Sequence, residues 1–290
     1  MTARRHRPSS IRSVLHRVAY MKSEQEQKRI RIGNGRWLRN AQHTRQSKRL
    51  ITMGTWNTRQ FGATSGYIDQ DLKLKVLIDL WDTRKWEIVA LTDTKLGPST
   101  TLATHNNNKP TWTVLSRGRV ALALNERWAQ AWQQSTTPIH TDGTGHQCRM
   151  MLVQIPCFQR LGLAILVTYA PSSNVPPEEH ETYFHNLEML ISKVKSRYTL
   201  ILAGDFNAEV GIRSPGTGTA LGSHGPPHRN NSGLRLCHFC NEHRLAVANT
   251  WTPQRNKTTW WHPRFGSSHL IDYFIITLLH TPILVMSTGF

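Results

Sequence analysis

Several segments of the sequence place a polar side chain directly after an apolar run, where it could take part in chemistry. The clearest is Leu202 to Asn207 (LAGDFN), in which an apolar run ends in Gly204 and is followed by a carboxylate and an amide two positions apart. Side chains at i and i+2 of an extended chain face the same way, so Asp205 and Asn207 can converge on one substrate group. Asp205 could then accept a proton or polarise a water while Asn207 holds an oxygen. An ordinary turn after a strand is the alternative interpretation.

Four other apolar runs also deliver one polar residue each, namely Asn57, Asp93, Tyr169 and Asp272. Each has a structural explanation when taken alone: a strand-end cap, a turn former, an interface aromatic, and a partly buried acid paired with an arginine. Five strands that each present one polar group at a similar place would gather these groups at one end of a sandwich. The set therefore predicts a site.

The elements that would position these side chains follow from the hydrophobic pattern. From residue 50 onward, short β-rich runs alternate with segments of helical period, which is typical of a layered α/β or α+β domain. Helices are predicted from Asp71 to Trp86, from Glu178 to Lys195, and from a cap at Ser232 to about His243. The predicted strands are 50–56, 87–92, 111–115, 120–125, 150–155, 161–169, 199–204 and 270–276. The stretch from Ala208 to Ser232, rich in Gly, Pro, His and Asn, is predicted to be a surface loop.

Together these motifs resemble the endonuclease/exonuclease/phosphatase superfamily, which includes DNase I and the apurinic endonucleases. The closest likeness is to the endonuclease domains of non-LTR (LINE-type) retrotransposons and to relatives of the craniofacial-development-protein type. It is carried by five ordered motifs, GTWN at 54–57, YAP at 169–171, GDFNA at 204–208, TWWHP at 259–263 and HLIDY at 269–273. The resemblance implies a DNase I-like four-layer sandwich, with two mixed β-sheets packed face to face and helices outside.

The resemblance also implies roles for seven residues. The family's metal-supporting Asn falls on Asn57, and its metal-binding carboxylate falls on Asp93, where the family has Glu. Because Asp is one methylene shorter and Mg²⁺ needs oxygen ligands in strict geometry, a bridging water would have to fill the gap. Tyr169 matches a tyrosine that contacts the scissile phosphate, and Thr259 matches a supporting threonine. Asp205 and Asn207 match the pair that orients the attacking water and the phosphoryl oxygens.

The final role falls on Asp272, which matches a carboxylate that orients a catalytic histidine. In the family that histidine ends a Ser-Asp-His motif on the last core strand, and no Ser-Asp-His occurs in this sequence. The only histidine after Asp272 is His280, in an unrelated Leu-His-Thr setting. A positioned acid-base group is worth about 10²- to 10⁴-fold in rate, so weak or no cleavage is expected. The last core strand could be missing as well.

The charge of the chain indicates a polyanionic partner. The 290 residues hold 36 Lys or Arg against 18 Asp or Glu, a formal net charge of +18. Residues 1–49 hold 14 Lys or Arg against two acids, a net charge of +12. This composition predicts a basic, disordered arm at 1–49, an endonuclease/exonuclease/phosphatase domain at 50–277 and an atypical, truncated tail at 278–290. DNA is the expected partner, with RNA as a second polyanion for the arm, and the protein is expected to be a monomer. A merely solubilising arm is the alternative.

Other features narrow the setting. Four cysteines are too few for a disulfide framework, so a reducing intracellular compartment is expected, with the nucleus favoured. The first 23 residues lack acids, which leaves a mitochondrial address as the alternative. No apolar stretch approaches the length of a membrane span, so no membrane is expected. The spacing Cys237-x-x-Cys240-x-x-His243 lacks a second ligand pair, and it favours a helix face over a zinc site.

The sequence thus predicts a Mg²⁺-dependent DNA endonuclease of retrotransposon origin, with Mn²⁺ as an alternative ion, weakened or inactivated by the absent Ser-Asp-His. The alternative is a catalytically dead nucleic-acid-binding fragment of the same fold. Lipid or inositol phosphodiesterases of this fold fit the motifs less well. Fold alone would not separate these classes.

Overall fold

The computed structural model describes residues 51–59, 70–104, 110–157, 162–215, 217–253, 258–261, 266–277 and 284–288. The predicted basic arm, residues 1–49, lies outside the described residues. So does most of the predicted tail, of which only 284–288 are described, as backbone. Within the described residues no helix is both long and apolar enough to cross a membrane.

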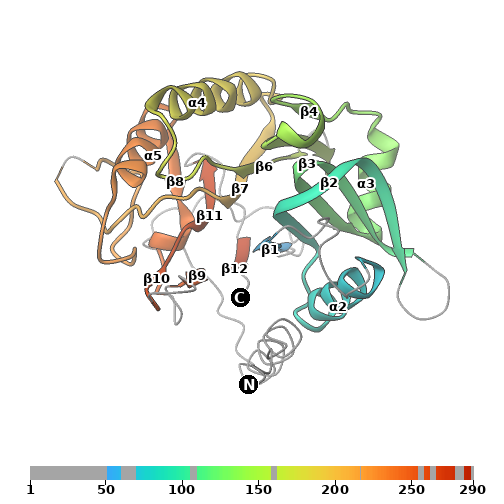
Figure 1. Cartoon of the computed structure of the whole chain (residues 1–290). Coiled ribbons are helices and arrows are strands. Elements are labelled where there is room, and N and C mark those ends of the chain that lie inside the picture. Colours follow the sequence, from blue (N-terminus) through green and yellow to red (C-terminus); the bar gives the residue numbers. More distant parts are fainter. Residues whose placement is uncertain are drawn as a thin grey trace, which may run out of the picture.

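Two mixed β-sheets form the body of the molecule (Figure 1). The four-stranded sheet has the order β12-β1-β2-β3 and consists of β1 (Ile51–Asn57), β2 (Ile88–Thr104), β3 (Pro110–Asn125) and β12 (Leu284–Thr288). The six-stranded sheet has the order β4-β5-β6-β7-β11-β8 and consists of β4 (His140–Thr141), β5 (Met150–Pro156), β6 (Gly162–Tyr169), β7 (Tyr198–Asp205), β8 (Leu245–Val247) and β11 (Asp272–Thr277). A short hairpin of β9 (Trp260–Trp261) and β10 (Ser268–His269) stands apart from both.

Strand sequences explain why the two sheets pack face to face. In β6, GLAILVTY, every residue except Tyr169 is buried, because alternate side chains enter two different cores. Leu163, Ile165 and Val167 meet Met53, Ile88 and Leu122 of the other sheet in the central core. Ala164 and Leu166 turn to the opposite face, under the helices. The main core is therefore shared by both sheets.

Helices cover the outer faces of both sheets (Figure 1). The six-stranded sheet is covered by α4 (Pro177–Ile191) and α5 (Asn231–Glu242), which bury Leu187, Leu190 and Leu236 against it. The four-stranded sheet is covered by α2 (Gln70–Thr83), whose Ile78 and Trp81 are almost fully buried. The predicted four-layer sandwich is confirmed.

Two helical features differ from those predicted, the N-cap of one helix and the presence of another. The third predicted helix is α5, but its N-cap is Asn230, whose side chain accepts from the Gly233 amide at 2.7 Å, and not Ser232. The sequence analysis missed α3 (Glu126–Ser135), capped by Asn125 through the Trp128 amide at 3.2 Å. Two single-turn 3-10 helices, Gly145–Gln147 and Ala248–Thr250, complete the helical elements that the structure describes.

The last core strand was expected to be missing, but the structure has a strand near the end of the chain. Residues 284–288 form β12, which pairs in parallel with β1, with Ile51 opposite Leu284 and Thr55 opposite Thr288. An edge strand exposes unpaired backbone N–H and C=O groups, and any extended segment with free backbone groups can satisfy them. The tail therefore supplies a strand at the edge of β1 although it lacks the expected motif.

Candidate active site at the strand ends

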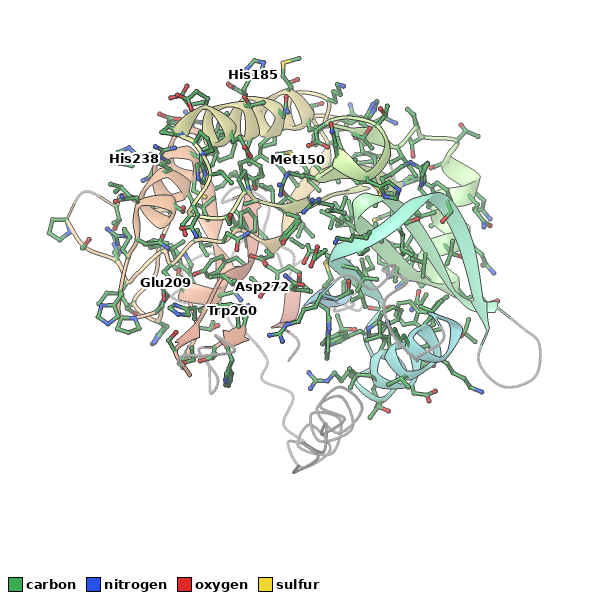
Figure 2. The ribbon with its side chains drawn as sticks, in the orientation of Figure 1. Met150, His185, Glu209, His238, Trp260 and Asp272 are labelled. Carbon is green, nitrogen blue, oxygen red and sulfur yellow. The ribbon has the colours of Figure 1, made fainter. Side chains whose placement is uncertain are left out.

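Three of the predicted residues form one row across adjacent strands of the six-stranded sheet. Tyr169 ends β6, Asp205 ends β7 and Asp272 begins β11. Asp205 is in register with Tyr169 on one side and with Asp272 on the other. Neighbouring strands lie about 4.8 Å apart, so the three side chains are fixed as near neighbours by backbone pairing. Asp272 lies near the centre of the molecule in Figure 2.

Gly204 makes this row possible because the backbone of the neighbouring strand leaves no room for a side chain at its position. Its φ is +145°, and a Cβ at this position would lie 2.0 Å from the carbonyl oxygen of Thr168. No side chain fits such an approach. The apolar run that the sequence ends in glycine therefore needs that glycine to bring Asp205 beside Tyr169.

Two asparagines hold Asp205 in place. Asn57, from the end of β1 in the other sheet, donates from Nδ2 to Asp205 Oδ2 at 2.7 Å. The Asn207 amide donates to Asp205 Oδ1 at 2.9 Å, and the Asn207 side chain donates to the carbonyl oxygen of Ala170 at 2.8 Å. Both oxygens of this buried carboxylate are thus bonded, and the 148-residue separation of Asn57 from Asp205 is closed across the two sheets.

Thr259 and Asp272 form the other half of the site. The Thr259 hydroxyl accepts from the amides of Ile271 at 2.9 Å and Asp272 at 3.0 Å, which fixes the start of β11. Asp272 is 4% exposed, and its Oδ1 has no hydrogen-bond partner in the described structure. A buried carboxylate oxygen without a partner carries a desolvation penalty of about 1–3 kcal/mol or more. Asp272 is the residue that the family resemblance matches to a carboxylate that orients a histidine.

Asp93 reaches the same rim on a strained stretch of β2. Its φ is +52°, and Arg59, Lys95 and Asn207 also have positive φ values, at +49°, +51° and +45°. Residues other than glycine seldom adopt this region, although Asp and Asn do so more readily than most. Three of these residues, Asp93, Asn207 and Arg59, bond to or act electrostatically on the carboxylates of the row. Unfavourable backbone held by the surrounding structure is typical of a functional site.

The carboxylates of the site disfavour one another's ionisation. Burial raises the pKa of Asp205 to about 6, with the Asp93 charge adding to the rise and the bonds from Asn207 and Asn57 opposing it. Burial raises the pKa of Asp272 well above its usual value, and the charge of Asp205 raises it further. Burial, followed by the charges of Asp93 and Asp205, raises the pKa of Tyr169 to about 12, so its phenol stays neutral and can donate a hydrogen bond. Burial therefore disfavours the ionised form of all three acids in the row, and neighbouring negative charges add to this effect.

The donor set of this site fits a hard divalent cation. Asp93, Asp205 and Asp272 and the amide oxygen of Asn57 are oxygen donors, which Mg²⁺ and Mn²⁺ prefer. Among the described residues, however, no three His, Cys, Asp or Glu side chains lie together in a group that could hold a metal ion by itself. Mg²⁺ is commonly held by one or two carboxylates together with waters and substrate phosphates, so a complete cage is not required.

His269, which was not among the predicted site residues, lies three residues before Asp272. The His269 ring lies with Nδ1 2.9 Å from Glu209 Oε1 and Nε2 3.0 Å from Ser267 Oγ. Both ring nitrogens are therefore engaged, and His269 does not supply the partner that Asp272 Oδ1 lacks. The signal was its place in the HLIDY motif, three residues before Asp272.

Two arginines beside Tyr169 were also missed. Arg149 lies directly before β5, and Arg119 lies within β3. Their guanidinium carbons lie 5.5 Å and 6.0 Å from the centre of the Tyr169 ring. No sequence motif singled them out from the other basic residues, because their common neighbour is reached only by folding.

Cys237 and Cys240 lie in the core under α5 and not at a metal site. Both thiols are almost fully buried among apolar side chains, and burial raises the pKa of each. His243 stacks on the Phe239 ring with centroids 4.3 Å apart. The spacing is therefore a helix face, as the sequence favoured.

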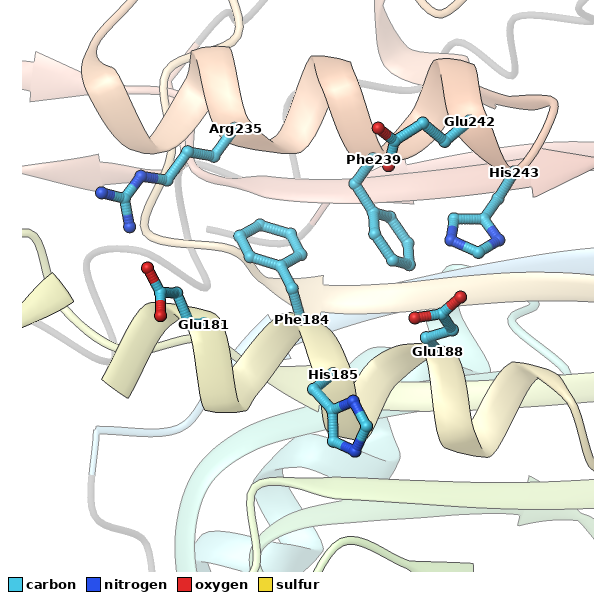
Figure 3. Close-up of a pocket in the computed structure, with 8 residues that line it drawn as sticks. All are labelled: Glu181, Phe184, His185, Glu188, Arg235, Phe239, Glu242 and His243. Carbon is cyan, nitrogen blue, oxygen red and sulfur yellow. The ribbon is translucent and has the colours of Figure 1, made fainter. Parts of the chain in front are cut away.

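A hollow of about 550 Å³ lies between α4 and α5, on the outer face of the molecule (Figure 3). Phe184 and Phe239 line it with ring centroids 5.3 Å apart, and Glu181 and Arg235 point toward each other at one end. It contains none of the predicted site residues. The chemistry of the site and the hollow between the helices are therefore separate features.

Sequence comparisons find relatives over part of this chain. No protein-family model matches the chain. Craniofacial development protein 2 from Bos taurus is 32% identical over 116 residues, which cover 39% of this chain and 19% of that protein. The same protein from Tragulus javanicus is 32% identical over 116 residues, 39% of this chain and 20% of its own length. The chain thus spans about a fifth of the length of the curated relatives it matches.

Solved structures match over most of the chain. The 3′ phosphatase NExo from Neisseria, bound to a product DNA hairpin, superposes with a TM-score of 0.51 at 15% identity, over 77% of this chain and 85% of its own. TDP2 from D. rerio, in complex with a single-strand DNA product, gives a TM-score of 0.51 at 13% identity, over 79% of this chain and 84% of its own. The endonuclease domain of TRAS1, a telomere-specific non-LTR retrotransposon, gives 0.45 at 15% identity, over 77% and 84%.

The fold is the feature that the solved structures share with this chain. Like NExo and TDP2, the chain has two mixed β-sheets packed face to face with helices outside, the DNase I-like fold that the sequence motifs predicted. Its sequence likeness to the craniofacial-development-protein type, also predicted, is confirmed over 116 residues.

Proposed function

We propose that this chain is a Mg²⁺-dependent DNA endonuclease, derived from a retrotransposon, that hydrolyses phosphodiester bonds and leaves a 3′-hydroxyl, with its activity weakened by the absence of Ser-Asp-His. The observation that carries the proposal is the row of Tyr169, Asp205 and Asp272 in register across three strands, joined to the other sheet by the bond from Asn57 to Asp205. The DNA-bound phosphatase NExo and the DNA-bound TDP2 of the same fold support DNA as the substrate class.

Different residues of the site have different roles in the proposed reaction. Asp205, with a pKa of about 6, is ionised at neutral pH and orients and deprotonates the attacking water. Tyr169 stays neutral and donates a hydrogen bond to a phosphoryl oxygen, where negative charge develops during the reaction. Asn57 and Asn207 keep the Asp205 carboxylate at a fixed angle, so that the water is aligned with the phosphorus.

Asp93 and Asn57 would hold the cation, with Asp205 and Asp272 nearby. When bound, a divalent ion supplies charge neutralisation at the phosphoryl oxygens and a template for the substrate. Burial raises the pKa of both Asp205 and Asp272, and a neighbouring carboxylate raises each further, Asp93 for Asp205 and Asp205 for Asp272. A bound cation would offset this smaller, repulsive part of the rise, which supports the assignment. Mn²⁺ has the same donor preference and serves as the alternative ion.

A plasmid-nicking assay tests the proposal. Supercoiled plasmid should be converted to the open circle in Mg²⁺ and not in EDTA, and Asp205→Ala should remove the activity. An Arg127→Ala variant is the matched control, because Arg127 pairs with Glu87 on the outside of the molecule and away from the row. Nicking that persists in EDTA or in Asp205→Ala would contradict the proposal.

A second candidate function is DNA binding without cleavage. It is favoured by Asp272 Oδ1, which is buried without a partner in the described structure, and by the absence of Ser-Asp-His from the sequence. In this case the Mg²⁺ assay would show no nicking while the protein still bound DNA. Binding measured alongside nicking separates the two functions.

The basic arm should dominate non-specific DNA binding in either case. Residues 1–49 carry a net charge of +12 and can neutralise several phosphates, each with release of counterions. Deletion of residues 1–49 should flatten the slope of log K against log salt, whereas an unchanged slope would refute a binding role for the arm. Substituting an RNA duplex for DNA in the same titration asks whether the arm also serves RNA. A nuclear location and a monomeric state belong to the same proposal.

A further inference from the structure

The row of strand-end residues extends one strand further than the predicted site. The Tyr169 amide donates to the carbonyl oxygen of Arg149 at 2.9 Å, which continues the pairing of Met150 with Thr168. Asp142 holds this position by accepting from the amides of Arg149 and Met150, both at 3.0 Å. The order across four neighbouring strands is therefore Arg149, Tyr169, Asp205, Asp272, which places a cation at one end and two carboxylates at the other.

A second arginine joins the cationic end from the other sheet. Arg119 of β3 donates its amide to the carbonyl oxygen of Cys148 at 2.9 Å, so β3 is tied to the residue directly before Arg149. Arg119 and Arg149 both direct their guanidinium groups to Tyr169, at 6.0 Å and 5.5 Å from its ring centre. Two cations from different sheets thus converge on one tyrosine.

Neither guanidinium is neutralised by a carboxylate in the part of the chain that the structure describes. Arg149 Nη1 donates to the Tyr169 carbonyl oxygen at 3.4 Å, and both side chains are half-buried. A guanidinium over an aromatic ring keeps its in-plane N–H groups available, and these groups match two oxygens of a phosphate. By contrast, Arg127 is paired with Glu87 at 3.3 Å.

We propose that Arg119 and Arg149 form a phosphate clamp that binds the DNA phosphate next to the one over Tyr169 and Asp205. The clamp rests on the proposed function, because it assumes that the scissile phosphate lies at Tyr169. Since the arginines lie at one end of the row only, the clamp fixes on which side of the cleaved bond the strand is held. The phosphate is an internal phosphodiester, which suits an endonuclease. A terminal phosphate would offer the arginines the same oxygens, and the second experiment distinguishes it from an internal phosphodiester.

The first experiment measures binding without cleavage. The full chain, in EDTA, is titrated with a fluorescent 20-base-pair duplex over a range of salt. Arg119→Ala/Arg149→Ala should weaken binding and lower the slope of log K against log salt by about 1, the value expected for one lost phosphate contact. Arg127→Ala should leave the slope unchanged. Equal slopes for the double variant and the parent would overturn the clamp, whether or not the protein nicks DNA.

The second experiment locates the phosphate. One neutral methylphosphonate is moved along the strand of the duplex. It should weaken binding of the parent protein at the phosphate over Tyr169 and at the phosphate next to it, whereas the double variant should be insensitive only at the second of these positions. Duplexes with and without a 5′- or 3′-phosphate form the second arm, and a dependence on the terminal group alone would overturn the internal phosphodiester. Arg149→Lys keeps the charge but loses the paired donors, so it should keep the salt slope and bind with about 3- to 10-fold lower affinity, an effect of roughly 1 kcal/mol.

If the arginines only orient Tyr169, the methylphosphonate effect will be the same in parent and double variant, and the clamp is wrong. If the parent binds with the clamp signature and still fails to nick in Mg²⁺, the clamp stands and the proposed endonuclease activity fails. The failure of the clamp and the failure of the proposed function therefore give different experimental results.

Discussion

The two carboxylates at the centre of the row, Asp205 and Asp272, differ in how completely they are partnered. Asp205 accepts from Asn57 on one oxygen and from the Asn207 amide on the other. Asp272 lies opposite it in register, equally buried, with Oδ1 lacking a partner in the described structure. Burial raises both pKa values, but the bonds from the asparagines limit the rise at Asp205 to about 6. One half of the site is therefore assembled, while the other half has a carboxylate with no group to orient.

The largest effect is expected from completing the Asp272 half. Replacing Leu278 to Phe290 with a family-like tail that carries Ser-Asp-His should return an imidazole for Asp272 to orient. Mg²⁺-dependent nicking should rise by at least about 10²-fold, the usual worth of a positioned acid-base group. Because 284–288 already pair with β1, the new tail has an edge at which to dock.

The control for this chimera is the same protein with Asp205→Ala, which should be inactive because the tail cannot replace the group that orients the water. A chimera that unfolds cooperatively and still fails to nick would move the lesion elsewhere, to Asp93 in the first instance, and would favour the binding-only function.

The second largest effect is expected on the pKa of Asp205 when its partner Asn57 is replaced. Asn57→Ala removes an amide donor that stabilises the ionised form of Asp205, so the pKa of Asp205 should rise above 6 by roughly one unit. Carboxyl-carbon NMR titration of the metal-free protein measures the shift. Thr58→Ala is the neighbouring control, because its hydroxyl bonds the carbonyl oxygens of Thr92 and Asp93 and not Asp205. If the pKa of Asp205 does not rise in Asn57→Ala, the hydrogen bond from Asn57 does not account for the difference between Asp205 and Asp272.

The unpartnered oxygen of Asp272 should lower the free energy of unfolding of the protein at high pH. A carboxylate whose pKa is raised by folding destabilises the folded state when it is ionised, so the penalty is absent at low pH and grows as pH rises through the raised value. Asp272→Asn should therefore be more stable than the parent at pH 8, by roughly 1 kcal/mol. The difference should shrink as the pH is lowered toward 4, as followed by thermal unfolding. A variant that is less stable than the parent at pH 8 would show that Asp272 is compensated by a group not identified above.

The smallest effect is expected at Asp93, which the resemblance pairs with Glu. Calorimetry should show tighter Mg²⁺ binding by Asp93→Glu than by the parent, by a few-fold, because the longer side chain reaches the ion without a bridging water. The φ of +52° favours Asp over Glu, so the same variant should unfold at a slightly lower temperature. Equal or tighter binding by the natural Asp93 would contradict the assignment.

Much of the fold and of the site was determined by the sequence itself. Apolar runs of strand length, helical stripes and the strand-ending Gly204 and Asp205 are local signals, because side-chain period and glycine conformation act over a few residues. They predicted the layered sandwich and the strands that carry Asn57, Tyr169, Asp205 and Asp272. The cap of α5 was misplaced because Ser232 is as good a local cap signal as Asn230. The helix α3 was missed because it buries only Trp128 and Ala129 and so has no long apolar stripe.

Only the tertiary structure decided which groups meet. Strand register sets Tyr169, Asp205 and Asp272 in one row, and the packing of two sheets brings Asn57 to Asp205 across 148 residues. The convergence of Arg119 and Arg149 on Tyr169, the engagement of His269 by Glu209, and the unpartnered Asp272 Oδ1 have no local signature. They depend on long-range backbone pairing and on burial, which are properties of the assembled sheets and not of any one segment.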